Sequence, residues 1–215
     1  MEDIVQDRLK KNIILIDYQV GNIGSIINMI KKIGYEAKLS DNQKEISSAE
    51  KLIFPGVGAF DEGMEKLNKS GLIPILIDKV INQKTPILGI CLGMQLLTEK
   101  SEEGNLPGLG WIKGETKKFK FKEEDNLRVP HMGWNTVHPM RTNSIFRDLE
   151  DNPRFYFVHS FYVDSHDSND VLGITNYGHD FASVIEKENI FGVQFHPEKS
   201  HRFGMKLLKN FIELQ

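Results

Sequence analysis

The chain's single cysteine lies in a segment that fits nucleophilic chemistry. The segment is Gly89-Ile90-Cys91-Leu92-Gly93, where an apolar run typical of a buried strand gives way to a helical pattern. Flanking glycines permit a sharp strand-to-helix turn that holds a nucleophile clear of the sheet. The positive end of the helix favours the thiolate, and the Leu92 N–H can stabilise an oxyanion. A lone cysteine is more often a small buried residue, but strand, glycines and helix together predict a nucleophile.

A second group of chemically capable residues lies near the end of the chain, in Gly192-Val193-Gln194-Phe195-His196-Pro197-Glu198. An apolar strand delivers His196 at its end, and Glu198 projects to the same side of an extended segment. A carboxylate orients imidazole, while the imidazole takes a thiol proton and later donates it to a leaving amine. Alone, this pair also fits a capped strand end with a satisfied histidine. Together with Cys91 it predicts a Cys-His-Glu catalytic triad.

The first half of the chain alternates short apolar runs with amphipathic stretches, which are typical of strands and helices in turn. The predicted strands are residues 12–17, 36–39, 51–54 and 86–90, and the predicted helices are residues 21–34, 61–68, 74–82 and 92–100. Strand–helix alternation of this kind predicts a parallel sheet with helices on both faces.

The second half has short β-type runs separated by Gly, Pro, Thr and aromatic residues. The predicted strands are residues 154–163, 171–176, 183–186 and 190–195, with a hairpin around 187–189 and a closing helix at 204–214. The predicted fold class is therefore α/β, with a mixed, mostly parallel central sheet flanked by helices and an antiparallel portion in the second half. We expect one domain over residues 11–215, preceded by an extension over residues 1–10 whose role the sequence does not explain.

Composition narrows the possible functions. The net charge of −3 offers no basic patch for nucleic acid, and no apolar run approaches the roughly 20 residues of a membrane helix. The acidic start is not a signal peptide, and one cysteine permits no intrachain disulfide, so we expect a cytoplasmic protein. The turn Gly21-Asn22-Ile23-Gly24 lacks the three-glycine pattern of a dinucleotide site. With no metal-ligand spacing either, we predict no metal and no organic cofactor.

The cysteine turn and the His-Pro-Glu segment resemble those of the class I glutamine amidotransferases. Further segments are similar to the HisH-type glutaminase subunits of imidazole glycerol phosphate synthase. They are Pro55-Gly56-Val57-Gly58-Ala59-Phe60, Val129-Pro130-His131-Met132-Gly133-Trp134-Asn135 and Tyr156-Phe157-Val158-His159-Ser160-Phe161. The resemblance runs from about Asn12 to the end of the chain, and the full set of motifs is specific.

The resemblance implies hydrolysis of glutamine to glutamate and ammonia through a thioester on Cys91. It places five residues near the substrate: Gly56, Gln95, His159, Ser160 and Phe161. The family has tyrosine where this chain has Phe161, and backbone contacts would survive that change. Val57 and Gly58 match a second oxyanion element beside Leu92, in a loop that rearranges when the partner subunit is loaded. Glycines on both sides of Val57 make a peptide flip there feasible, and a tight turn after a strand is an equally valid interpretation.

The same resemblance implies a second polypeptide that uses the ammonia, because this chain has no room for a synthase barrel of roughly 250 residues. That partner would be a HisF-type (β/α)8 barrel in a one-to-one heterodimer, making imidazole glycerol phosphate and AICAR in histidine biosynthesis. The matching interface positions are Asn22, Trp134, Tyr156 and Lys199. Each also has an ordinary interpretation: a helix start, a core aromatic, a strand residue and a solvated charge.

Three alternatives remain open at this point. HisH-like paralogues supply ammonia for amidine formation on a surface-polysaccharide sugar, and the ending Ser200-His201-Arg202-Phe203-Gly204-Met205 is close to that subgroup. A stand-alone cysteine hydrolase of γ-glutamyl or peptide substrates would share the cysteine turn without needing the other motifs. A catalytically dead interaction subunit would tolerate loss of the triad, which is intact here.

Overall fold

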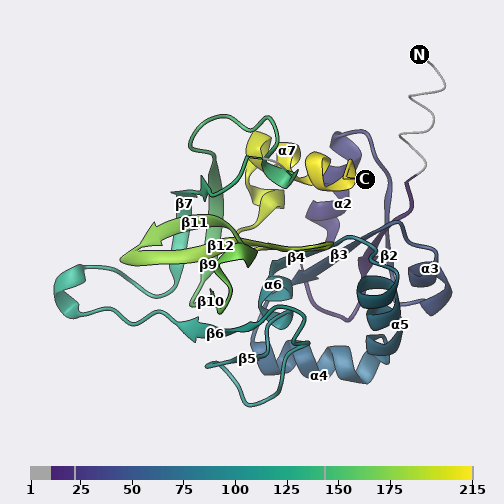
Figure 1. Ribbon diagram of the computed structural model, residues 1–215, viewed down its shortest axis with the longest axis horizontal. Coiled ribbons are helices and arrows are strands. Elements are labelled where there is room, and N and C mark those ends of the chain that lie inside the picture. The colour runs from purple at the N-terminus through teal and green to yellow at the C-terminus, as the bar shows by residue number, and fades with distance from the viewer. Residues whose placement is uncertain (1–10, 22, 143, 215) are drawn as a thin grey trace.

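The computed structural model describes residues 11–21, 23–142 and 144–214 (Figure 1). The predicted extension over residues 1–10 and the predicted interface residue Asn22 lie outside these ranges. Within them, every helix is too short or too polar to span a lipid bilayer.

The first half of the chain forms the parallel part of a large central sheet. Its strands are β1 (Ile13–Ile16), β2 (Ala37–Ser40), β3 (Lys51–Gly56) and β4 (Ile87–Cys91). They lie in the order β2-β1-β3-β4, and each neighbouring pair is parallel. The helices between them are α2 (Ile23–Lys32), α3 (Gln43–Ser47), α4 (Phe60–Ser70), α5 (Ile73–Ile77) with the π-helical turn η1 (Asp78–Asn82), and α6 (Leu92–Leu96).

Two apolar cores cover the two faces of this sheet, because successive strand residues point to opposite sides. Ile13 and Leu15 pack into one core with residues of α2 and of the C-terminal helix α7 (His201–Ile212). Ile14 and Ile16 pack into the other core, with residues of α3, α4, α5 and α6. Figure 1 shows α2 and α7 together on one side of the sheet and α4 and α5 on the other. The predicted arrangement of helices on both faces is confirmed.

The second half extends the sheet with mostly antiparallel strands. They are β5 (Lys100–Ser101), β6 (Gly114–Lys118), β8 (His138–Pro139), β10 (Phe161–Ser165), β11 (Val171–Tyr177), β12 (His179–Lys187) and β13 (Ile190–Val193). Strand β13 lies parallel beside β4 and antiparallel beside β12, so it joins the two parts of the sheet. A separate antiparallel pair is formed by β7 (His131–Thr136) and β9 (Arg154–His159). The predicted mixed α/β fold and the hairpin at 187–189 are confirmed.

Two local predictions differ from the structure, and one short helix was not predicted. The helix predicted over 92–100 is the shorter α6, because Thr98 Oγ1 donates to the Gln95 carbonyl at 2.7 Å and Lys100 already belongs to β5. The strand predicted over 154–163 is divided at Ser160 into β9 and β10, which lie in different sheets. Helix α3 was not predicted; the Asn42 side chain caps it by accepting from two backbone N–H groups.

Candidate active site

Cys91 occupies a strained turn between β4 and α6. Its φ of 54° and ψ of −110° are unusual for a residue with a side chain, and such strain is characteristic of functional sites. The flanking glycines make this turn possible because α6 passes close to the neighbouring strands. A Cβ on Gly93 would lie 1.8 Å from the Phe54 carbonyl oxygen, and one on Gly89 would lie 2.8 Å from that of Gly93. The turn has the geometry predicted for a nucleophile elbow.

The backbone of His196 is fixed against strand β9. Its N–H donates to the Tyr156 carbonyl at 2.9 Å, and its own carbonyl accepts from Ser200 Oγ at 2.6 Å. The same Ser200 hydroxyl accepts from the Tyr156 N–H at 3.0 Å. These contacts place the imidazole just beyond the end of β13, near the end of β4 that carries Cys91. Parallel neighbours therefore deliver the two side chains to the same edge of the sheet.

The imidazole of His196 lies between the thiol and a carboxylate. Its Nδ1 is 2.8 Å from Glu198 Oε1, and both side chains are almost fully buried. Burial lowers the pKa of His196, but its hydrogen bonds with the Cys91 thiol and with Glu198 outweigh burial and raise this pKa to about 10. With Nδ1 engaged by Glu198, Nε2 is the nitrogen that faces the thiol. The structure thus brings together the three residues predicted as a triad.

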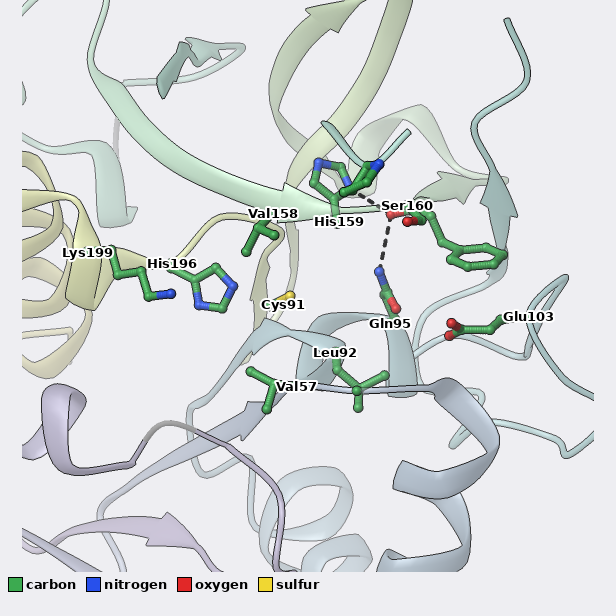
Figure 2. A pocket seen from close by; sticks show the side chains of 13 residues that line it. Val57, Cys91, Leu92, Gln95, Glu103, Val158, His159, Ser160, His196 and Lys199 are labelled. Carbon is green, nitrogen blue, oxygen red and sulfur yellow. Dashed lines mark hydrogen bonds between the residues drawn. The ribbon is translucent and has the colours of Figure 1, made fainter. Parts of the chain in front are cut away.

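A cavity of about 350 Å³ opens over Cys91 and has a size suited to a small polar molecule. Figure 2 shows the His196 and Lys199 side chains at one end of it, Cys91 and Leu92 in the middle, and Glu103 at the other end. The lining residues are Val57, Gly58, Cys91, Leu92, Gln95, Glu103, Pro130, Val158, His159, Ser160, Phe161, His196 and Lys199.

Most of the residues predicted to bind substrate line this cavity: Gln95, His159, Ser160 and Phe161. Gly56 is an exception among the described residues. It closes β3 opposite Cys91, and a Cβ there would lie 2.7 Å from the Gly93 nitrogen, so its place in the structure is one of close packing.

The predicted oxyanion residues Val57, Gly58 and Leu92 line the cavity. Leu92 begins α6, so its N–H has no acceptor within the helix. Val57 is 44% exposed, and Gly58 adopts a φ of +106°. Because only glycine adopts such a φ without strain, the turn at 57–58 depends on this residue type.

A buried amide beside the thiol was not predicted. Gln194 is fully buried, and its Nε2 lies 3.7 Å from Cys91 Sγ. Its Oε1 accepts from Gln95 Nε2 at 3.1 Å, and Gln95 also donates to the Phe161 carbonyl at 3.2 Å. The available signal was the strand period of two, which places Gln194 on the same side as His196.

The carboxylate of Glu103 was also missed. It contributes to the cavity lining, and its Oε2 accepts from the Phe60 N–H at 2.8 Å, at the start of α4. No local sequence pattern marks Glu103, because it lies in an irregular segment whose position depends on contacts with α4.

The predicted interface residues that the structure describes form one surface group beside His196. Trp134 is 39% exposed and its ring lies 6.2 Å from that of Tyr156, so it is not a core aromatic. Lys199 Nζ lies 5.6 Å from the centre of the Tyr156 ring. His201 stacks on Trp134 with ring centroids 5.3 Å apart and planes within 2°.

Across the residues that the structure describes, no group of three or more His, Cys, Asp or Glu side chains could hold a metal ion.

The chain is similar to known proteins in family, sequence and structure. Residues 14–214 match the family described as glutamine amidotransferase class-I. "Imidazole glycerol phosphate synthase subunit HisH 2" of Methanococcus maripaludis is 55% identical over 201 residues, which cover 94% of this chain and 98% of that protein. The protein of the same description from Pseudomonas aeruginosa is 51% identical over 202 residues, covering 94% and 99%.

The solved structures agree on the fold. The structure of PurLQS from Thermotoga maritima superimposes with a TM-score of 0.70 at 18% identity, covering 93% of this chain and 96% of that one. At that identity the likeness concerns the fold alone, whereas the matches in sequence span nearly the whole chain. The chain belongs to the class I glutamine amidotransferase family and, within it, to the HisH subunits of imidazole glycerol phosphate synthase.

Proposed function

We propose that this chain hydrolyses L-glutamine to glutamate and ammonia on Cys91 and passes the ammonia to a synthase subunit in histidine biosynthesis. The observation that carries the proposal is the buried pairing of His196 with Glu198 at 2.8 Å, next to the Cys91 thiol at the floor of a cavity. Family membership supports the same chemistry.

The first half-reaction forms a thioester. His196 holds the proton of the thiol, and the high pKa of its imidazole stabilises the resulting thiolate–imidazolium pair. The Cys91 sulfur attacks the side-chain amide carbon of glutamine, and the N–H of Leu92 and the loop at Val57 stabilise the oxyanion. His196 then gives its proton to the departing nitrogen, so the C–N bond breaks and ammonia leaves.

The second half-reaction regenerates the enzyme. His196 is now neutral and takes a proton from a water molecule that attacks the thioester carbon. The C–S bond breaks and glutamate leaves. His196 keeps the proton, so the Cys91 thiolate again lies beside an imidazolium. Glu198 keeps the imidazole in one orientation through both steps and stabilises its protonated form.

The charges around the cavity match a free amino acid. The carboxylate of Glu103 is suited to the α-ammonium group, at the end of the cavity away from His196 (Figure 2). Gln95 lies between Cys91 and Glu103 in Figure 2, and Ser160 and Phe161 also line the cavity, so Gln95 and the backbone at 160 and 161 can bind the remaining polar groups. Because the contacts proposed at 160 and 161 use the backbone, phenylalanine can replace the tyrosine expected at position 161.

The acceptor of the ammonia is proposed to be a HisF-type (β/α)8 barrel in a one-to-one heterodimer, acting as a lyase in the cytoplasm. The relatives' descriptions as synthase subunits support a partner subunit. The exposed apolar side chains of Met132 and Trp134, next to Tyr156 and Lys199, support a docking surface here. Because Tyr156 bonds to the backbone of His196, a partner on this surface would lie close to the ammonia-releasing end of the cavity.

The other hypotheses have less support. Sequence relatives at 45–55% identity over nearly the whole chain are described as HisH subunits, which favours histidine biosynthesis over amidine formation on a surface sugar. A stand-alone hydrolase has no use for the exposed Trp134 group.

The proposal is tested by purifying the chain with and without the synthase subunit of its own organism. We expect glutamate release from glutamine to be far slower without the partner, and the complex to convert the imidazole-forming ribonucleotide intermediate of histidine synthesis. Trp134→Ala should weaken the complex by about 2 kcal/mol, as expected for a central interface aromatic. Ile77→Ala, which removes an equally exposed apolar side chain on α5, is the matched control. Fast glutamine hydrolysis without any partner would contradict the proposal.

A further inference from the structure

Two buried histidines lie side by side at the wall of the glutamine cavity. His131 on β7 pairs with His159 on β9 in the two-stranded sheet, and their exposed fractions are 3% and 6%. The Nδ1 atom of His131 lies 2.9 Å from the Nε2 atom of His159. His159 lines the cavity, whereas His131 is not among the described residues that do so. The proposed reaction gives His131 no role.

The direction of the hydrogen bonds between these rings follows from their surroundings. His159 Nδ1 lies 2.7 Å from the Phe161 carbonyl oxygen, which can only accept, so the hydrogen of His159 must be on Nδ1. Burial lowers the pKa of His159 to about 3, which keeps the ring neutral at pH 7 and leaves Nε2 without a hydrogen. Nε2 therefore accepts, and His131 donates to it from Nδ1.

The hydrogen bond on the far side of His131 also has one direction. Burial lowers its pKa to about 4, so this ring is also neutral, and its Nε2 must accept. Asn135 Nδ2 lies 3.2 Å from that atom. The amide of Asn135 has one orientation, because its Oδ1 accepts from the Thr136 N–H at 2.8 Å and its Nδ2 donates to the Asn176 carbonyl at 2.9 Å. The network is thus a one-way series of donors from Asn135 through His131 and His159.

The series ends on a backbone group of the cavity wall. The Phe161 carbonyl accepts from His159 and also from Gln95 Nε2 at 3.2 Å, so one oxygen fixes both the 161 peptide and the Gln95 side chain. Figure 2 shows these two hydrogen bonds converging between Gln95 and His159. Without the hydrogen bond from His131, the Nε2 atom of His159 would be a buried acceptor without a donor, and the ring would lose the contact that holds it against the Phe161 carbonyl.

We propose that His131 is a positioning residue of the glutamine site, which holds the ring of His159 by the hydrogen bond that it donates and through this ring positions the Phe161 carbonyl and Gln95. This inference rests on the proposed glutaminase function for its substrate. A purely structural role for His131 is the competing explanation, since its ring stacks on Phe157 and Tyr177 with centroids 4.8 and 4.1 Å apart.

Two substitutions at one position separate hydrogen bonding from ring packing. His131→Phe keeps an aromatic ring between its neighbours but removes the donor. His131→Asn removes the ring but keeps an N–H donor at about the place of Nδ1. His179→Phe is the control, because His179 packs in the same aromatic cluster, against Phe119 and Tyr162, without belonging to the series.

The first test is nitrogen NMR of the full chain, which reports the tautomer of each imidazole without substrate or partner. We expect His131 and His159 to be neutral from pH 6 to 8, both with the hydrogen on Nδ1. His131→Phe should leave the hydrogen of His159 on Nδ1 but move its Nε2 resonance to that of a nitrogen without a donor, and His131→Asn should return that resonance toward its position in the unmodified chain. An Nε2–H tautomer of His159 in the unmodified chain would overturn the inference.

The second test is calorimetric binding of L-glutamine to the Cys91→Ala chain in complex with its synthase subunit, where no turnover occurs. Adding His131→Phe should weaken binding about tenfold, the effect of leaving one buried acceptor without a donor. With His131→Asn in place of His131→Phe, the affinity should lie within about threefold of that of Cys91→Ala alone. With His179→Phe it should change less than about twofold. Equal weakening by the Phe and Asn variants would mean that packing alone matters, and would refute the positioning role.

Asn135→Asp provides a separate variant should His131→Phe fail to fold. A carboxylate at position 135 only accepts, so it should draw the hydrogen of His131 to Nε2 and weaken glutamine binding. Unchanged tautomers and affinity would count against the series. If the Cys91→Ala complex bound no glutamine at all while the tautomers were as expected, the proposed function would fail, together with the role of His131 in binding, and the hydrogen-bonded series itself would stand.

Discussion

Histidines at the two ends of one network have opposite properties although they are equally buried. The pKa of His196 is raised to about 10, whereas those of His131 and His159 are lowered to about 4 and 3. All three side chains belong to residues that are no more than 6% exposed. Burial therefore does not explain the difference. The partners do, because His196 faces a carboxylate and a thiol, while the other two face only each other, a carbonyl and an amide.

The contrast separates two tasks in a single cavity. A histidine that exchanges protons needs an anionic neighbour that stabilises its charged form. A histidine that fixes a binding group performs best when it cannot change its protonation state near neutral pH. Gln194 connects the two ends, since it contacts the Cys91 sulfur on one side and Gln95 on the other.

Removing the nucleophile should have the largest effect. Cys91→Ala should lower glutamine-dependent turnover of the complex by a factor of about 10⁵ or more, since no thioester can form. Synthesis from added ammonium salts should be retained, because the proposed acceptor site lies on the partner. Both activities are measured on the same preparation, and equal loss of both would contradict the division of labour between the subunits.

Removing the Glu198 carboxylate should bring the pKa of His196 closer to those of His131 and His159. Glu198→Gln should lower kcat by a factor of about 10² to 10⁴ and change the KM for glutamine less than about threefold, since Glu198 acts through His196. It should also lower the pKa of His196, measured by NMR titration. A change confined to KM would show that Glu198 contacts substrate instead.

The same variant should alter the pH dependence of stability. The pKa of His196 in the folded chain is above its ordinary value of 6.5, so its interactions stabilise the fold fully below pH 6.5 and are lost as the pH rises through about 10. Urea unfolding from neutral to alkaline pH should therefore show a smaller loss of stability for Glu198→Gln than for the unmodified chain.

The neutral histidines should have the reverse dependence. The pKa of His131 in the folded chain is below 6.5, so the fold is stabilised above pH 6.5 and loses that stability as the pH falls through about 4. Between neutral pH and pH 4, the free energy of unfolding of His131→Asn, measured in urea, should fall by roughly 2 kcal/mol less than that of the unmodified chain. Identical acid profiles would show that His131 is not held neutral by the fold.

The smallest effect is expected at Gln194, which contacts both Cys91 and Gln95. Gln194→Met keeps similar volume but removes the donor to the Cys91 sulfur and the acceptor for Gln95, so kcat/KM should fall about fivefold to tenfold. The tautomers of His131 and His159 should be unchanged, because their hydrogen bonds do not include Gln194. A loss as large as that of Glu198→Gln would mean that the amide takes part in proton transfer.

The sequence by itself determined the alternation of strands and helices, the nucleophile turn and the pairing of His196 with Glu198. These follow from local periodicity and from short spacings, which a linear chain displays directly. The break at Ser160 between β9 and β10 was not visible, because both strands carry the same β-type pattern and only their different partners separate them. The early end of α6 was missed for a similar reason, since the chain beyond it belongs to β5, which pairs with β6.

Only the tertiary structure decided which distant polar groups complete the site. Glu103, Gln194, Asn135 and His131 have no local signal of function, and their positions at the cavity depend on strand pairings and on contacts with α4. The pKa of a buried histidine likewise depends on which charges the fold brings next to it. Local spacing fixes which residues share a segment, whereas long-range packing fixes which segments meet. The pairing of His196 with Glu198 needed only the first, whereas the meeting of that pair with Cys91 and the histidine series needed the second.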